Sequence, residues 1–317
     1  MTIPSLARIE RVNLREAWPN EARDFTPWLA ENIAELGQAL GMDLMLQETE
    51  AAVGGYSLDV LATDLNQNRQ VIIENQLEAT NHDHLGKLLT YAAGYDANVI
   101  VWLTREFRDE HRQVLDWLNQ RTGEDTQFFG VVVELWRIGD SPYAPHFKTV
   151  ATPNDRRKET MGARGGRSRE SQRDERYREF FQPLFDGLIE KGFTNARKAQ
   201  PKSWQNFSAG FGQKIIYGAN FTRQKRARVE VYIDSPDGEW NIELLENLER
   251  RKDEIESVLG MLDWQRLENR RACRISLTRP GSIDDDADTL AETRTWMAVN
   301  LLRFKQAFGP HLAELVD

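Results

Sequence analysis

Two acidic residues stand in stretches that are otherwise typical of buried strands. Asp59 lies within YSLDVL and Glu74 lies within VIIENQ. A carboxylate among apolar neighbours is costly to bury unless it is paired or bound to a metal ion. Fifteen residues and one polar turn separate the two acids, so adjacent antiparallel strands would place them side by side. Two adjacent carboxylates suit a hard divalent cation, Mg²⁺ or Mn²⁺, completed by water and a substrate phosphate.

The spacing of three further residues, Gln76, Lys87 and Tyr91, is consistent with a position beside Asp59 and Glu74. Gln76 is two residues after Glu74, so both side chains leave the same face of a strand. Lys87 and Tyr91 are four residues apart on the next expected helix and share one face of it. Gln76 could position a water or a phosphate but supplies no charge, whereas Lys87 could supply a positive charge. We therefore expect Asp59, Glu74, Gln76 and Lys87 to be catalytic.

Three other acids are candidates for the same site. Glu21 lies just before the first expected helix, and Glu31 lies within it. The helical positions place Glu31 far from the apolar stripe, which favours solvent exposure over metal binding. Glu50 lies on the strand before Asp59, where a supporting acid and a plain surface residue are equally consistent with the pattern.

The patterns around these residues predict an α/β fold with a mixed sheet in the N-terminal half. A helix is expected over 26–40, with Thr26 as its N-cap and Pro27 at its first position. The expected strands are 44–50, 56–64, 70–77, 98–104, 127–138 and 147–151, and the later helices are 84–95 and 106–121. His82 and His84 fall where the helix 84–95 begins, and capping or exposure is favoured over metal binding. No His or Cys spacing matches a zinc site.

A change of composition divides the chain. Hydrophobic residues nearly vanish over 153–174, which predicts a basic linker between a domain at 1–152 and a domain at 175–317. The second domain is expected to be α+β. Its expected helices are 175–191, 242–259 and 288–308, and its expected strands are 212–221 and 228–234.

Charge is unevenly distributed along the chain. The net charge is −9, yet residues 161–230 contain 15 lysines and arginines and seven acidic residues. This clustering favours nucleic acid as the partner, with Arg223, Lys225 and Arg226 as contacts. The interleaved aromatic residues are consistent either with base stacking or with the domain core. They are Trp204, Phe207, Phe211, Tyr217 and Phe221, and the other cations are Arg197, Lys198, Lys202, Lys214 and Arg228.

Composition excludes several classes of protein. The single cysteine, Cys273, rules out an intramolecular disulfide and is expected to be an inert residue in an apolar strand. No apolar run approaches the ~20 residues of a membrane span, and the first residues lack the pattern of a secretory signal. We expect a cytoplasmic protein with no membrane partner.

The motif Leu58-Asp59, followed by Glu74-Asn75-Gln76 in this order of elements, resembles the PD-(D/E)XK nuclease superfamily. The resemblance implies a restriction-endonuclease-like N-terminal domain in which the two acids bind Mg²⁺. Gln76 stands where that superfamily usually has lysine. Some branches carry Gln-x-x-x-Tyr on the next helix, and this chain has Lys87-x-x-x-Tyr91, so the two residue types look exchanged.

Longer segments resemble an uncharacterised prokaryotic family that joins a nuclease-like half to a C-terminal domain of unknown function. The segments are 73–91, 217–221 and 270–275. The resemblance implies a Mg²⁺-dependent endonuclease acting on DNA, in restriction or phage defence, with a second copy or a defence-system component as further partner. Two alternatives stay open. One is an inactive nuclease-fold module that binds nucleic acid or protein, and the other is a regulatory scaffold whose C-terminal domain recruits a protein.

Overall fold

The computed structural model describes residues 7–123, 125–153, 169–211, 215–267 and 270–316. The chain forms two compact units. Unit 1 comprises residues 1–40, 46–64 and 68–165, and unit 2 comprises residues 41–45, 65–67 and 166–317. Most of the expected linker, residues 154–168, lies outside the described residues. None of the helices in the described ranges is long and apolar enough to cross a membrane.

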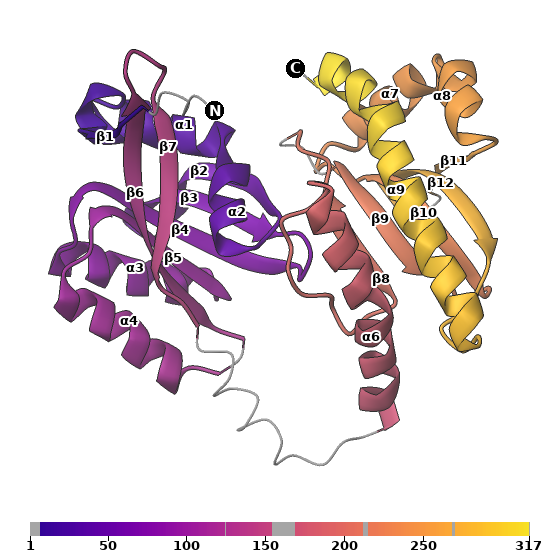
Figure 1. Ribbon diagram of the computed structural model, residues 1–317, viewed down its shortest axis with the longest axis horizontal. Coiled ribbons are helices and arrows are strands. Elements are labelled where there is room, and N and C mark those ends of the chain that lie inside the picture. Colours follow the sequence, from indigo (N-terminus) through magenta and orange to yellow (C-terminus); the bar gives the residue numbers. More distant parts are fainter. Residues whose placement is uncertain (1–6, 124, 154–168, 212–214, 268–269, 317) are drawn as a thin grey trace, which may run out of the picture. The chain divides into compact units, whose positions relative to one another are not determined.

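Unit 1 is built around a seven-stranded mixed sheet (Figure 1). The strands follow the order β1-β6-β5-β4-β3-β2, and β7 pairs with β6 outside that order. Their bounds are β1 Ile9–Val12, β2 Leu44–Val53, β3 Tyr56–Asp64, β4 Arg69–Ala79, β5 Val99–Glu106, β6 Gln127–Ile138 and β7 Ala144–Ala151. Strand β5 runs parallel to β4 and β6, whereas β3 pairs antiparallel with β4. The expected mixed α/β sheet is confirmed.

The parallel strands are connected by helices, which is the connection that such strands usually require. Helix α3 (His82–Gly94) joins β4 to β5, and α4 (Asp109–Arg121) joins β5 to β6. Leu88 and Tyr91 of α3 belong to one buried cluster with Ile72, Ile100 and Trp102 of the strands. The face of β4 that carries even-numbered residues is therefore the face covered by α3.

The N-terminal helical segment begins earlier than expected. It consists of η1 (Leu14–Glu16), a π-helical turn η2 (Glu21–Phe25), α1 (Thr26–Glu31) and α2 (Ile33–Leu40). The prediction of Thr26 as N-cap is wrong, because Asn20 caps the preceding turn through its side chain. Thr26 is buried instead, and its Oγ1 accepts a hydrogen bond from Asn75 Nδ2 at 3.1 Å. The segment is also interrupted at Asn32, so 26–40 is two helices.

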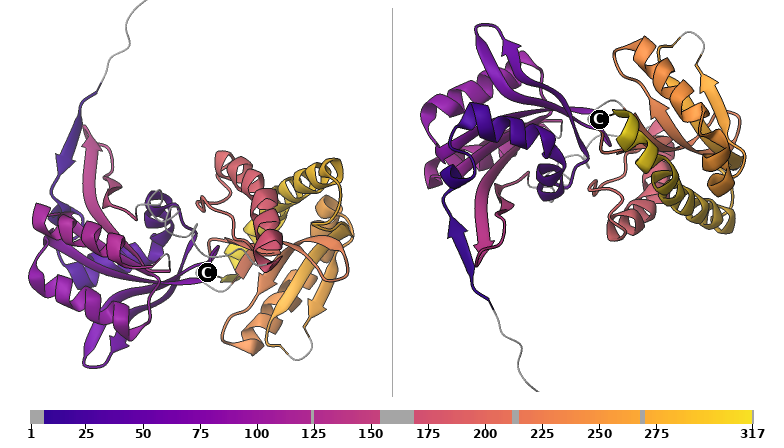
Figure 2. Two further views of the ribbon diagram at one scale, coloured as in Figure 1. Left: turned by 90° about the horizontal axis from the view of Figure 1, so that it is seen from below. Right: turned by 90° about the horizontal axis from the view of Figure 1, so that it is seen from above.

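Unit 2 is an α+β domain, as expected, with an antiparallel sheet in the order β11-β12-β10-β9-β8. The strands are β8 Trp204–Ser208, β9 Ile215–Phe221, β10 Arg226–Ile233, β11 Asp263–Arg266 and β12 Cys273–Pro280, and the helices are α6 Arg169–Glu190, α7 Gly238–Glu249, α8 Lys252–Leu259 and α9 Ala287–Val316. Helices α6 and α9 lie on the same side of this sheet (Figure 2).

Three expectations for unit 2 need correction. Helix α6 begins at Arg169, so the last residues of the expected linker 153–174 are helical. The single helix expected over 242–259 is two helices that are separated at Arg250 and Arg251. The helix expected over 288–308 runs from Ala287 to Val316, and strands β8, β11 and β12 are not among the expected strands.

The core of unit 2 lies between the helices and one face of the sheet. Odd-numbered strand residues such as Tyr217, Val229 and Ile275 are buried in one cluster with helix residues such as Phe181 and Phe304. Among the interleaved aromatic residues, Phe207, Tyr217 and Phe221 belong to this core and are not available for base stacking. Cys273 is buried here as well, and burial raises the pKa of its thiol, as an inert cysteine requires.

Candidate functional site

The candidate site begins where strands β3 and β4 separate. Their antiparallel pairing ends at Val60 and Ile73, one residue short of Asp59 and Glu74. Beyond that point the Asp59 carboxylate replaces the strand partner, because its Oδ2 accepts a hydrogen bond from the backbone N–H of Asn75 at 2.7 Å. The interaction fixes Asp59 at the edge of β4 that β3 no longer pairs with, beside Glu74.

Glu21 occupies the next position along the same edge. Its Oε2 accepts a hydrogen bond from the backbone N–H of Leu77 at 2.6 Å, two residues after the N–H that Asp59 receives. N–H groups two residues apart point toward the same edge of a strand. Two carboxylates, one from β3 and one from η2, thus satisfy the unpaired edge of β4 and lie close to Glu74.

Glu74 is the most buried acid of the group. The residue is 2% exposed, and Lys87 Nζ lies 3.9 Å from its Oε1. Its Oε2 is buried, and among the described residues no group donates a hydrogen bond to it. Such an oxygen is costly to leave unsatisfied. A buried, unsatisfied carboxylate oxygen beside a second carboxylate fits a divalent cation, so the residues present suit Mg²⁺ or Mn²⁺.

Burial and like charge alter the acidity of both carboxyls. Burial raises the pKa of Asp59 well above its usual range, and the neighbouring Glu21 and Glu50 raise it further. The pKa of Glu74 is also raised, first by burial and then by Asp59, while Lys87 lowers it. Ionising both carboxyls is therefore unfavourable without a cation, and a bound cation would offset their mutual repulsion.

The other two candidate acids, Glu50 and Glu31, are both exposed, and only Glu50 lies near the site. Glu50 is exposed on β2, and its Oε2 accepts a hydrogen bond from Ser57 Oγ at 2.7 Å. It is near enough to raise the pKa of both Asp59 and Glu74. Glu31 is exposed at the last position of α1. Glu21, not Glu31, is thus the acid from this segment that reaches the site.

Gln76 is held by two hydrogen bonds that the sequence does not reveal. Its Oε1 accepts from Trp102 Nε1 at 2.9 Å, and its Nε2 donates to the carbonyl oxygen of Ala79 at 2.7 Å. The residue is 2% exposed. One N–H of the amide remains for a water or phosphate, so Gln76 acts mainly as a fixed part of the wall beside Glu74.

Lys87 and Tyr91 lie on the same face of α3, as their spacing indicates. The Lys87 side chain is 44% exposed, so its ammonium has freedom to move while it lies near Glu74. Tyr91 is buried, and burial together with Glu74 and Asp59 raises its pKa to about 12. The phenol therefore keeps its proton at neutral pH.

The histidines near the site have structural partners. The Asn81 side chain caps α3 by accepting from the backbone N–H of His84, and its Oδ1 is 3.0 Å from His84 Nδ1. His82 Nδ1 lies 2.7 Å from Nε2 of the buried His111, which in turn contacts Thr80. The residue that caps α3 is thus Asn81 and neither of the two histidines, of which His82 is exposed and His84 is half-buried. The sequence pattern does not single out His111.

Within the ranges that the structure describes, no three His, Cys, Asp or Glu side chains are grouped as a metal-binding set. Two carboxylates are a common protein contribution to Mg²⁺, which retains several waters. A pocket lies beside Glu21 on the η2 side, and neither Asp59 nor Glu74 lines it. It is lined by Arg15, Asn20, Glu21, Ala22, Gln76, Glu78, Asn81 and His84.

The expected nucleic-acid contacts lie at the turn between β9 and β10. Arg223 and Lys225 are exposed there. Arg226 begins β10 and donates to Thr278 Oγ1 on β12 through Nε at 3.0 Å and through a terminal nitrogen at 2.8 Å. Lys214 lies outside the described residues.

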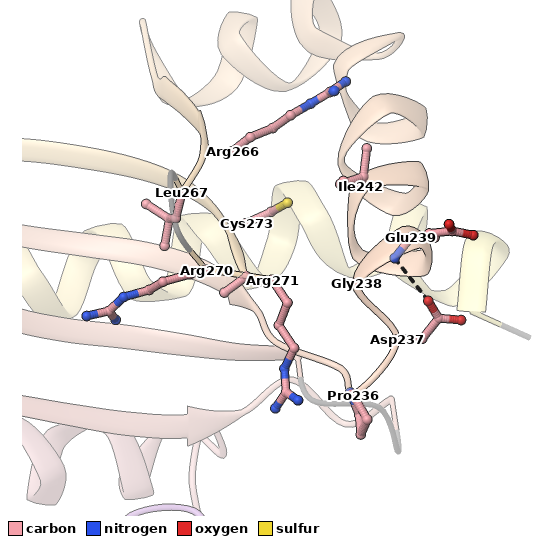
Figure 3. Close-up of a pocket in the computed structure, with 11 residues that line it drawn as sticks. Pro236, Asp237, Gly238, Glu239, Ile242, Arg266, Leu267, Arg270, Arg271 and Cys273 are labelled. Carbon is pink, nitrogen blue, oxygen red and sulfur yellow. Dashed lines mark hydrogen bonds between the residues drawn. The ribbon is translucent and has the colours of Figure 1, made fainter.

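A separate pocket in unit 2 is lined by three arginines, but their guanidinium groups do not converge on it. Arg266, Arg270 and Arg271 point in three different directions (Figure 3). Arg266 is paired with Glu246. The N-terminus of α7 at this pocket is already capped by the Asp237 side chain. The charges around the pocket are therefore divergent and partly neutralised.

Comparison with known proteins finds one family model that is similar to part of the chain. Residues 176–312 match the family described as Domain of unknown function (DUF4268). None of the curated proteins and none of the solved structures matches the chain.

Proposed function

We propose that this protein is a Mg²⁺-dependent nuclease of the PD-(D/E)XK type that hydrolyses phosphodiester bonds, with DNA as its substrate. The single observation that carries the proposal is the buried, unsatisfied Oε2 of Glu74 beside Asp59 at the edge of β4. The arrangement has two carboxylates for the metal ion and a lysine within reach of them. We also propose a cytoplasmic location, because the only cysteine is a buried, free thiol.

Asp59 and Glu74 would hold the metal ion. When bound, Mg²⁺ neutralises charge on the phosphate and lowers the pKa of its bound water. The Asn75 N–H keeps one oxygen of Asp59 occupied and thereby orients the carboxylate. Glu21 holds the neighbouring N–H of Leu77 and adds negative charge close to the metal ligands.

Lys87 would supply the positive charge that Gln76 cannot. Its ammonium lies 3.9 Å from Glu74 on a half-exposed side chain, so it can shift from the carboxylate to a phosphate oxygen. A cation placed at the scissile phosphate stabilises the charge that develops in the transition state. Gln76, fixed by Trp102, would keep the wall of the site rigid and offer one N–H to water or phosphate.

The experiment that tests the proposal is cleavage of labelled single-stranded DNA, duplex DNA and RNA with Mg²⁺, with Mn²⁺ and with EDTA. We expect metal-dependent cleavage of DNA that EDTA abolishes and that E74A lacks. Cleavage that persists in EDTA, or that E74A retains in full, would contradict the assignment of the site.

One observation favours a second candidate function. Gln76 stands where the superfamily usually has lysine, and its amide is committed to Trp102 and Ala79. A chain that has lost the lysine could keep the fold as a non-catalytic module that binds nucleic acid. Metal-enhanced binding of DNA with no cleavage of any substrate would support this candidate over the nuclease.

A further inference from the structure

A second charged cluster lies in unit 2, on the sheet face opposite the helix-packed core. Arg228 and Glu230 are two residues apart on β10 and share a face, and Arg274 lies on the neighbouring strand β12. Arg228 Nε is 2.9 Å and Arg274 Nε is 2.6 Å from the same oxygen, Oε2 of Glu230. One carboxylate thus holds two guanidinium groups.

Glu230 is fixed from several sides. It is 7% exposed, and its Oε1 accepts a hydrogen bond from Asn220 Nδ2 at 2.8 Å. Gly218 on β9 lies directly opposite, and a Cβ at that position would come within 2.8 Å of Glu230 Cγ. The absence of a side chain at Gly218 is what leaves room for the carboxylate between the two arginines.

The cluster has an excess of positive charge. Two guanidinium groups face one carboxylate, and the arginine side chains are only 20% and 16% exposed. Burial and the neighbouring Arg274 lower the pKa of Arg228, while Glu230 and Asp263 oppose that shift. Both Nε atoms lie within ion-pair distance of Glu230 Oε2, but none of these three buried atoms makes a hydrogen bond among the described residues. The terminal nitrogens point to other partners, and one of these in Arg274 lies 3.5 Å from Gln265 Oε1. Terminal guanidinium nitrogens form paired hydrogen bonds with phosphate oxygens.

Other cations continue from the cluster across the same face. Arg226 is two residues before Arg228 on β10 and is exposed. Trp204 on β8 pairs with Asn220 in register, and Lys202 Nζ lies 5.1 Å from its ring centre. Asp263 is an exposed acid on this face at the β11 edge. The positive charge of these residues exceeds the negative charge, which is complementary to a chain of phosphates.

We propose that Arg228, Glu230 and Arg274 form a phosphate-binding site that takes a backbone phosphate of a nucleic-acid strand on this sheet face. Glu230 is a positioning residue, because it orients both guanidinium groups without contacting the ligand. The identity of the ligand as nucleic acid rests on the proposed nuclease function. The site itself follows from the geometry of unit 2.

The test is binding of a fluorescein-labelled single-stranded DNA oligonucleotide to the full chain in EDTA, followed by anisotropy over a range of salt. EDTA prevents cleavage, so the outcome does not depend on whether the protein is a nuclease. We expect R228Q/R274Q to weaken binding at least about tenfold and to flatten the salt slope by about one unit, because one phosphate is no longer neutralised. The control R250Q/R266Q removes two arginines of unit 2 outside the cluster and should change affinity less than about twofold.

Two further comparisons separate a built site from diffuse charge. R228K/R274K keeps the positive charge but loses the planar guanidinium groups, which can bind a phosphate through two nitrogens. We expect this variant to bind several-fold more weakly than the parent chain. It also decides the question if R228Q/R274Q fails to fold, as judged by circular dichroism. Equal weakening by R228Q/R274Q and R250Q/R266Q, or parental affinity in R228K/R274K, would overturn the site.

Discussion

Each unit buries a charged cluster on its sheet, and the two clusters differ in the sign of the charge that they lack. In unit 1, Asp59 and Glu74 lie beside Glu21 and face Lys87, whose nitrogen is 3.9 Å from Glu74. In unit 2, one glutamate is held by two arginines at 2.9 and 2.6 Å. The first cluster is short of positive charge and the second is short of negative charge.

This contrast indicates what each cluster can bind. Residual charge in a buried place is costly, and a ligand of the opposite sign removes that cost. A divalent cation meets the need in unit 1, where a carboxylate oxygen has no hydrogen-bond donor among the described residues. A phosphate meets the need in unit 2. The two proposed ligands, a metal ion and a phosphate, would both serve the phosphodiester hydrolysis that we propose.

The largest effect expected is the loss of catalysis when either of the two acids proposed to bind Mg²⁺ is removed. E74A and D59A should each lower Mg²⁺-dependent cleavage by at least about a thousandfold, or ~4 kcal/mol. The fold should persist, because removing one carboxylate also relieves like-charge repulsion. Cleavage of labelled DNA with matched circular dichroism spectra checks this. E31A, which removes an exposed acid of the same unit, is the control, and equal loss in E31A would contradict the contrast.

A smaller effect is expected at the turn that extends the positive face of unit 2. Reversing the charge in R223E/K225E/R226E should weaken DNA binding by more than about tenfold and lower the salt slope by roughly one unit for each phosphate that the turn no longer neutralises. Titration of labelled DNA at several salt concentrations measures both quantities. Unchanged affinity would restrict the binding surface to residues outside this turn.

A further prediction concerns Lys87, the positive charge that faces the acidic cluster of unit 1. K87A should lower the single-turnover rate at least about tenfold, or ~1.4 kcal/mol, because the developing phosphate charge loses its partner. Mg²⁺ binding should not weaken, since Lys87 competes with the metal ion for Glu74. Quench-flow rates and Mg²⁺ titrations distinguish the two quantities. K148A, an exposed lysine on β7, is the control, and a normal rate in K87A would remove Lys87 from the catalytic group.

The smallest effect concerns stability without metal. The pKa of Glu74 is raised in the folded state, so its contribution to stability is full below the unfolded pKa of ~4.3 and is lost as the pH rises through the folded value. We expect the melting temperature in EDTA to fall from weakly acidic to alkaline pH and E74Q to lessen that fall. Mg²⁺ should restore stability at high pH in the parent chain but not in E74Q. A parallel pH profile for E74Q would show that Glu74 is not the destabilising acid.

Much of unit 1 is predictable because its signals are local. The bounds expected for β3 and β6, 56–64 and 127–138, are those observed, since turns and alternating or continuous apolar residues define each strand without its neighbours. The proximity of Asp59 and Glu74 is also predictable, because a single short turn sets the register of that hairpin. The spacing of Lys87 and Tyr91 correctly places both on one face of α3.

Features that depend on distant partners are not predictable. Gln76 is fixed by Trp102, which belongs to a parallel strand reached only through a helix. The sequence identifies Arg228 as one cation among many and gives no sign of its link to Glu230 and Arg274. That link depends on the register between β10 and β12, which a long connection leaves undefined. The sequence by itself determined which residues carry charge and where the central strands of unit 1 lie. Only the tertiary structure decided which charges share a buried place, because burial and register create the unbalanced charge that a ligand can neutralise.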